Sequence, residues 1–240
     1  MTEGDEAPVE TPALRRKVFG RRSGHKLRAR QADILDTGLT RLAVPLPPPG
    51  EILDPRGLFP RAVADVWFEI GFGGGEHLAA QAEAHPDIGI IGAEPFVNGM
   101  ASLLRHVEER RLDNVRVLAD DARLLLAALP EASLSRAFLL FPDPWPKSRH
   151  HKRRFVQQET LDLLARALKP GGEFRVASDI MGYIEWTLAQ VGLHHGFEWL
   201  AEGPADWRAR TEDWPPTRYE AKAIAAGRKP AYLRFRRVGG

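Results

Sequence analysis

The sequence predicts an α/β protein built on a doubly wound, mostly parallel β-sheet. Short apolar runs alternate with amphipathic helical stretches, a glycine-rich turn follows the first run directly, and acidic residues end successive runs. Strands and helices alternating at this spacing imply right-handed crossovers and a parallel sheet covered on both faces. Residues 232–236 alternate at period two, which predicts an antiparallel edge strand near the C-terminus.

The individual elements follow from the periodicity of the apolar positions. Apolar runs predict strands over 66–70, 88–92, 115–118, 137–141 and 174–177. Helical spacing predicts helices over 76–84, 97–111, 154–168 and 181–191. The stretch Lys169-Pro170-Gly171-Gly172 supplies the stop signals after the third helix.

The chain is expected to hold one large domain preceded by an arm. Residues 1–50 are interpreted as a basic N-terminal arm and a Pro-rich linker, partly disordered, and residues 51–240 as the domain, with the folded core starting near Val63. Eight basic residues and no acid lie between Arg15 and Arg30, and few periodic apolar positions occur there. The segment from Pro45 to Pro55 is rich in proline, as linkers are.

Composition excludes several classes of protein. The absence of cysteine rules out disulfides, thiolate zinc sites and a cysteine nucleophile. The histidine pairs 150–151 and 194–195 are adjacent, so their side chains diverge, and no metal is predicted. No stretch is long and apolar enough for a membrane span, and the acidic N-terminus is unlike a signal peptide, so we expect a cytoplasmic protein without an obligate protein partner.

The net charge of +2 conceals a segregation along the chain. Residues 51–145 hold 8 basic and 15 acidic residues, whereas residues 146–240 hold 17 basic and 11 acidic residues. An acidic centre suits a small polar cofactor, and basic flanks suit a polyanion that releases counterions on binding. Uneven surface charge without any partner explains the same counts equally well.

The turn after the first strand favours a nucleoside cofactor other than a dinucleotide. It reads Glu69-Ile70-Gly71-Phe72-Gly73-Gly74-Gly75-Glu76. Gly71 and Gly73 allow the backbone to approach a ligand closely at the carboxyl end of the strand. A dinucleotide fingerprint would place its third glycine at position 76, where Glu76 would repel a pyrophosphate. The turn therefore argues against a dehydrogenase.

Carboxylates end the following strands as well. Glu94 lies 23 residues beyond Gly71, about where an acid meets ribose hydroxyls. Asp121 ends the third strand, where a carboxylate can accept from an adenine amine. Each acid alone is more often a helix cap or a surface group, but their succession at strand ends favours a cofactor site.

The loop after the fourth strand combines prolines, an acid, an aromatic residue and a basic cluster. It reads Phe-Pro-Asp-Pro-Trp-Pro-Lys-Ser-Arg-His-His-Lys-Arg-Arg over residues 141–154. Asp143 and Trp145 can project into the crevice, and five basic residues then follow: Lys147, Arg149, Lys152, Arg153 and Arg154. Beside a cofactor turn, this pattern predicts a nucleobase pocket bordered by RNA-binding, phosphate-contacting residues. An ordinary turn and a solvated helix start are the alternative.

The chain resembles the bacterial tRNA (guanine-N7-)-methyltransferases. The resemblance rests on the segment 142–154, on Glu69 to Gly75, Gly92 to Phe96, Ser178-Asp179 and Thr217 to Lys222, and it covers about residues 50–237. It implies a Rossmann-like class I methyltransferase fold, S-adenosyl-L-methionine as methyl donor, and tRNA as substrate, modified at guanine 46 of the variable loop. By this resemblance, the donor contacts are Glu69, Glu94, Asp121 and Asp143, and the RNA contacts are Lys147, Asp179, Thr217, Arg218, Tyr219 and Glu220.

Asp143 is the expected catalytic residue. Guanine N7 has an in-plane lone pair and no proton, so its methylation needs alignment rather than a strong base. The product ring is cationic, so the Asp143 carboxylate can stabilise the developing charge, or it can orient guanine together with Asp179. Trp145 can stack on the base or simply pack.

Two other functions compete with this hypothesis. Asp143-Pro144-Trp145 is faintly similar to the D-P-P-Y loop of nucleic-acid amino-methyltransferases, although the second proline is missing. A noncatalytic tRNA-binding module with the same fold should carry a broken glycine turn. The turn here is intact.

Overall fold

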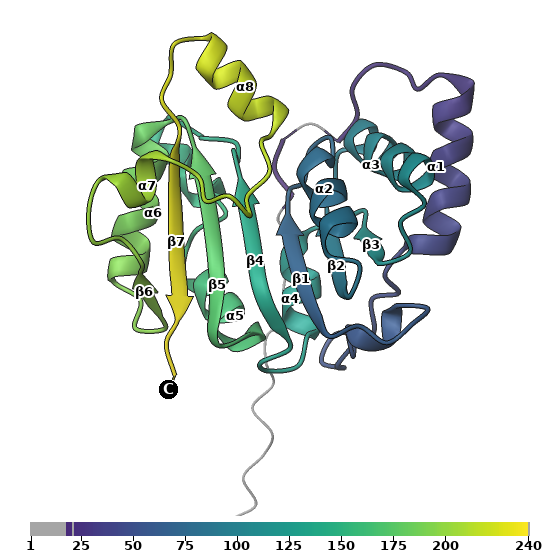
Figure 1. Cartoon of the computed structure of the whole chain (residues 1–240), viewed down its shortest axis with the longest axis horizontal. Coiled ribbons are helices and arrows are strands. Elements are labelled where there is room, and N and C mark those ends of the chain that lie inside the picture. Colours follow the sequence, from purple (N-terminus) through teal and green to yellow (C-terminus); the bar gives the residue numbers. More distant parts are fainter. Residues whose placement is uncertain (1–17, 21, 240) are drawn as a thin grey trace, which may run out of the picture.

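The computed structural model describes residues 18–20 and 22–239. Residues 1–17 and residue 21, which belong to the arm predicted to be partly disordered, lie outside this range. The described residues form two helical layers on a central sheet (Figure 1).

Within the described chain, seven strands form one sheet in the order β3-β2-β1-β4-β5-β7-β6. The strands are β1 (Asp65–Ile70), β2 (Ile88–Ala93), β3 (Val115–Leu118), β4 (Leu134–Leu140), β5 (Leu168–Ser178), β6 (Phe197–Trp199) and β7 (Ala231–Arg237). Strands β3, β2, β1, β4 and β5 are parallel, and β7 pairs antiparallel with β5. The predicted doubly wound sheet and its antiparallel C-terminal strand are confirmed. The three-residue β6, which the sequence did not predict, pairs with the outer side of β7.

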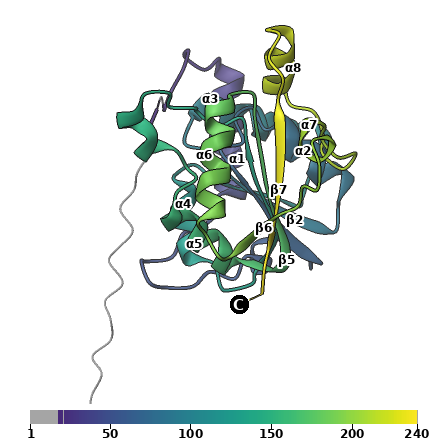
Figure 2. The same cartoon turned by 90° about the vertical axis from the view of Figure 1, so that its left-hand side faces the viewer.

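The helices divide between the two faces of the sheet. They are α1 (Ala29–Leu42), α2 (Glu76–Ala84), α3 (Val97–Arg110), α4 (Ala122–Ala128), α5 (Gln158–Ala167), α6 (Met181–Gly192), α7 (Ala205–Arg208) and α8 (Arg218–Ala225). Apolar residues of α4, α5 and α6 form one core with the sheet, and those of α1, α2 and α3 form the other. Figure 2, which views the sheet nearly edge-on, shows α4, α5 and α6 on one side and α2 on the other.

One predicted helix begins later than expected, and the helices α1, α4, α7 and α8 lie outside the four predicted helices. The helix predicted over 154–168 begins only at Gln158, and a 3-10 helix, η2 (Ser148–Arg153), precedes it. Gln157 and Thr160 form a capping box there, which fixes the start of α5. The helix α1 was not predicted. Its Ile34 and Leu42 are buried, and its Gly38 lets it approach Leu104 of α3 closely.

Candidate active site

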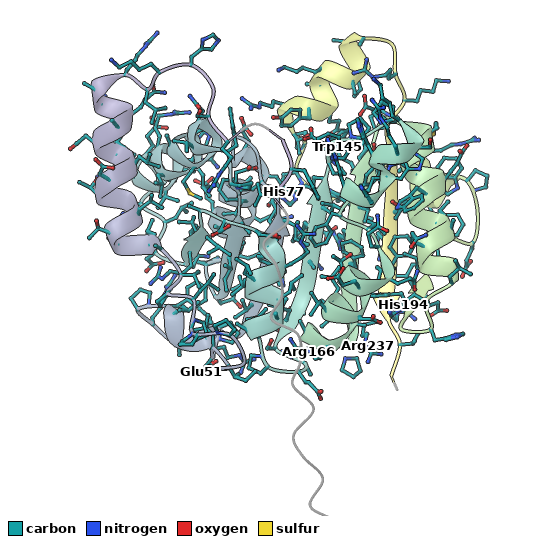
Figure 3. The ribbon with its side chains drawn as sticks, turned by 180° about the vertical axis from the view of Figure 1, so that it is seen from behind. Glu51, His77, Trp145, Arg166, His194 and Arg237 are labelled. Atoms are coloured by element: carbon teal, nitrogen blue, oxygen red, sulfur yellow. The ribbon has the colours of Figure 1, made fainter. Side chains whose placement is uncertain are left out.

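A cavity of about 370 Å³ lies at the carboxyl ends of the parallel strands. Its wall comes from the turn after β1, the residues after β2 and β3, the loop after β4, the start of α8 and the N-terminal residues Val18 and Phe19. Figure 3 shows Trp145, which lines the cavity, at the end of the sheet nearest α8. This is the crevice where open α/β sheets bind ligands.

The glycine turn after β1 lies beside the cavity and is bonded to the cavity wall through Glu94. Gly73 has a φ of +57°, a left-handed conformation that favours glycine. Its N–H donates to Glu94 Oε2 over 2.8 Å. A Cβ at this position would come within 3.0 Å of the Tyr219 ring, so the turn also fits closely under α8.

Glu94 is held in the cavity wall by two backbone hydrogen bonds. Its two oxygens accept from the backbone N–H groups of Gly73 and Phe96, and the residue is only 8% exposed. Burial raises the pKa of Glu94, the two backbone donors lower it, and the negative charges of Asp143 and Glu69 raise it further; the net pKa lies above its ordinary value. Glu94 can therefore accept hydrogen bonds from a ligand at a fixed position.

The other residues predicted to contact the methyl donor either line the cavity or lie behind its wall. Gly71, Asp121 and Asp143 line the cavity, as Glu94 does. Asp121 also caps α4, accepting from Arg123 N, and it forms an ion pair with the Arg123 guanidinium over 2.7 Å. Glu69 is buried behind the wall, where its Oε2 lies 2.7 Å from His77 Nδ1.

Asp143 lies in a constrained loop at the mouth of the cavity. Phe141 and Trp145, two residues on either side, have φ values of +50° and +43°. Non-glycine residues adopt this region at a cost, so surrounding contacts must hold the loop. Asp143 itself is exposed and lines the cavity, which leaves its carboxylate accessible to a ligand.

Arg154 supplies those contacts, and its predicted role in RNA binding needs correction. Its guanidinium donates to Pro144 O over 3.0 Å and to Gly182 O over 3.1 Å, and it packs on the rings of Tyr183 and Trp186. Only 5% of the residue is exposed. Arg154 therefore holds the Asp143 loop and is not placed to contact phosphates.

Three of the four remaining basic residues face outward. Lys147, Arg149 and Lys152 are exposed on and beside η2. Arg153 is half-buried, with its guanidinium 4.9 Å from the Trp145 ring. The structure thus brings three of the predicted RNA-binding side chains to one surface next to the cavity mouth.

The four residues from Thr217 to Glu220, which are predicted to contact RNA, have two kinds of environment. Thr217 and Glu220 form a capping box at the start of α8, and Glu220 is 6% exposed and also accepts from Tyr232 OH. These two side chains therefore hold the start of α8, and their contact with RNA stays a prediction. Arg218 and Tyr219 are exposed, and Tyr219 lines the cavity. Asp179 forms an ion pair with Arg228.

A segment that the sequence analysis assigned to the arm completes the cavity. We call residues 18–20 and 22–25 the N-terminal segment. It is held at the start of α3: Gly24 N donates to Asn98 Oδ1 over 2.7 Å, Asn98 Nδ2 donates to His25 O over 2.8 Å, and Val97 N donates to Arg22 O. Phe19 packs edge-to-face against Trp145.

No group of three or more His, Cys, Asp or Glu side chains that could hold a metal ion occurs among the described residues. No helix in the described part of the chain is long and apolar enough to cross a membrane.

The strand order and the cavity at the glycine turn define the class of the protein, a Rossmann-like class I methyltransferase. The family described as "Putative methyltransferase" matches residues 64–233. Among solved structures, the crystal structure of the 16S rRNA methyltransferase KamB superposes with a TM-score of 0.54 at 17% identity, covering 74% of this chain and 89% of that chain. At this identity the likeness concerns the fold alone.

Two relatives define the family more narrowly. A tRNA (guanine-N(7)-)-methyltransferase of Rhodospirillum rubrum is 56% identical over 95% of this chain and 90% of its own length. One of Paramagnetospirillum magneticum is 54% identical over 98% of this chain and 97% of its own length. The chain belongs to the family of tRNA (guanine-N(7)-)-methyltransferases, which confirms the resemblance identified from the sequence.

Proposed function

We propose that this protein transfers a methyl group from S-adenosylmethionine to N7 of a guanine in tRNA, and that its target is guanine 46 of the variable loop. The relatives carry the name of this activity. The single observation that supports it most is the position of Asp143, which is exposed at the mouth of an acid-lined cavity and directly precedes an exposed basic surface. We also infer that the protein acts in the cytoplasm, on the tRNA pool there, without an obligate protein partner.

The cavity suits a cationic nucleoside cofactor. Its volume of about 370 Å³ lies within the range of roughly 300–1,000 Å³ typical of small-molecule sites. Glu94, Asp120, Asp121 and Asp143 line it, an acidic set that disfavours a pyrophosphate and accepts hydroxyl and amine donors. When bound, S-adenosylmethionine supplies an electrophilic methyl group on a sulfonium. In this assignment Glu94 accepts from the ribose and the Asp120–Asp121 pair lies on the adenine side.

The residues at the mouth position the base and respond to its charge. N7 attacks through an in-plane lone pair and releases no proton, so the site needs no general base. The Asp143 carboxylate stabilises the positive charge that develops on the guanine ring. Because the loop on either side of Asp143 is constrained and tied down by Arg154, the carboxylate is preorganised for this task.

The exposed basic surface orients the RNA. Lys147, Arg149 and Lys152 are placed to contact phosphates, which position an RNA without reading its sequence. N7 lies in the deep major groove of A-form RNA, where side chains do not reach it, whereas a loop guanine is accessible. This favours a variable-loop guanine over one in a stem.

The experiment is a methyl-transfer assay followed by site-specific cleavage. The protein is incubated with labelled S-adenosylmethionine and unmodified tRNA, and the product is treated with borohydride and aniline, which cut at 7-methylguanine. We expect one cut, at position 46. A matched transcript carrying adenine at 46 should accept no label. Label without scission would contradict N7 as the target, and scission elsewhere would contradict the position.

A further inference from the structure

A buried chain of polar side chains runs along one side of α2. It starts at Glu69, whose Oε2 lies 2.7 Å from His77 Nδ1. His77 Nε2 lies 3.3 Å from Gln81 Nε2, and Gln81 Nε2 donates to the backbone carbonyl of Asp213 over 2.9 Å. Glu69, His77 and Gln81 are each at most 2% exposed, so the chain is shielded from water.

The partners fix the hydrogen positions along this chain. The Asp213 carbonyl accepts only, so the Gln81 amide must point its NH₂ group there. The second N–H of that group then donates to His77 Nε2, which must be unprotonated. In this arrangement the Nδ1–H of His77 donates to Glu69. Each link satisfies the next, as a buried polar network requires.

The far end of the chain is a segment that is firmly attached to the sheet. Asp213 accepts from Arg175 through both oxygens, over 3.1 and 2.9 Å, and also pairs with Arg136. The Arg175 guanidinium, together with Thr211 and Arg136, holds the pKa of Asp213 well below its usual value against the opposing effect of burial. The next residue, Trp214, is 1% exposed and packs against Tyr232.

This segment continues directly into α8, which reaches back to the glycine turn. Tyr219 lies against Gly73, and Arg218 Nε is 3.6 Å from Glu76 at the start of α2. The segment 210–220 therefore contacts the glycine turn and α2 at two places. Its beginning contacts Gln81, and its end, in α8, contacts Gly73 and Glu76. Glu69, in turn, acts electrostatically on Glu94 in the cavity wall.

We propose that His77 and Gln81 are positioning residues that couple cofactor binding to RNA binding by linking Glu69 to the segment 210–220. The proposal rests on the proposed function. RNA that contacts Arg218 and Tyr219 acts on this segment, the segment acts on Gln81 through the Asp213 carbonyl, and His77 passes the change in hydrogen bonding to the Glu69 carboxylate behind the cavity. By linkage, cofactor and RNA then alter each other's affinity by the same factor.

The test measures this factor by calorimetry. The Kd of S-adenosylhomocysteine is determined with and without saturating unmodified tRNA, so that no methyl transfer intervenes. For the wild type we expect tRNA to strengthen binding by about fivefold or more. In Gln81→Met, which keeps the side-chain length but removes both hydrogen bonds, the factor should fall to within about twofold of one. His77→Asn keeps a donor near Glu69 but loses Gln81, and it should behave in the same way.

Two controls separate coupling from stability. Gln158→Met makes the same change on the exposed side of α5, where the amide contacts Gln190, and should alter nothing. Asn114→Ala removes a buried amide that donates to three carbonyls of the α2–β2 connection, and should lower the melting temperature without altering the factor. A wild-type factor of one, or an unchanged factor in Gln81→Met, would overturn the proposal. Wild-type protein that binds tRNA but forms no 7-methylguanine would overturn the proposed function instead.

Discussion

Replacing Arg154 by methionine should destabilise the protein without reducing the salt dependence of RNA binding. The change keeps an apolar stem against Tyr183 and Trp186 but removes the guanidinium that donates to Pro144 O and Gly182 O. Leaving a buried acceptor unpaired costs ~1–3 kcal/mol for each carbonyl. Each lost cation–π contact costs ~0.5–1 kcal/mol more. The protein no longer buries a charge, which offsets part of this loss.

The net loss in unfolding free energy is therefore about 2–4 kcal/mol. For a chain of 240 residues, at ~2–4 °C per kcal/mol, the melting temperature should fall by roughly 5–15 °C. Displacement of the Asp143 loop by ~1 Å should also lower the rate of methyl transfer by about 10²-fold.

Lys152→Met is the matched control, because Lys152 belongs to the same basic cluster but is exposed. It should leave the melting temperature unchanged and lower the slope of log K against log salt for tRNA by ~0.7–0.9, as expected for one lost phosphate contact. Filter binding at several salt concentrations and thermal denaturation measure both variants. If Arg154→Met lowered the slope of log K against log salt and kept the wild-type melting temperature, Arg154 would be a phosphate contact and its structural role would be refuted.

Three further predictions concern the cavity. Asp143→Asn should lower the single-turnover rate at saturating tRNA and cofactor by about 10²-fold or more with an unchanged melting temperature, and a wild-type rate would remove the charge from the mechanism. The pKa of Glu94 is raised, mainly by burial, so the wild-type affinity for S-adenosylhomocysteine should weaken as the pH falls towards and through that pKa, because the protonated carboxyl loses its acceptor capacity. Calorimetry should show this acid limb missing in Glu94→Gln; its persistence would mean that another group titrates. Asn98→Ala removes two hydrogen bonds to the N-terminal segment, so trypsin should cleave that segment faster and cofactor affinity should fall. Faster cleavage with unchanged affinity would show that the segment is not a working wall of the cavity.

The sequence predicted the parts of the fold that depend on local patterns. Helix α2 begins and ends at the predicted residues, because a glycine turn marks its start and apolar spacing its length. Helix α1 was missed because its apolar positions, Ile34, Leu35, Leu39 and Leu42, lie in a polar stretch next to a basic run. Those four positions share one helical face, and they were the signal that could have revealed it.

Roles that depend on whether a side chain points into the protein or towards solvent could not be predicted from residue type. Arg154 and Lys152 are both basic and only two positions apart, yet one is buried under the Asp143 loop and the other is exposed. Which one turns inward is decided by η2 and by the carbonyls it meets, all of which are tertiary features. Likewise, the sequence around Glu69 does not indicate that one of its carboxylate oxygens forms a hydrogen bond with His77. A histidine eight residues later on a buried helix face is compatible with such a contact.

The two segments that complete the cavity explain how a common fold acquires a particular substrate. The alternation of strands and helices places Glu94, Asp121 and Asp143 at the carboxyl ends of the parallel strands. Any protein with this strand order can do the same. Phe19 and Tyr219, in contrast, come from outside that alternation, one before the sheet begins and one in the excursion before its last strand. Both side chains line the cavity, and Tyr219 also lies against the glycine turn. A ligand as large as tRNA can therefore act on the cofactor cavity through these two walls without any change in the sheet, which is why we place specificity in the added segments and the chemistry at the strand ends.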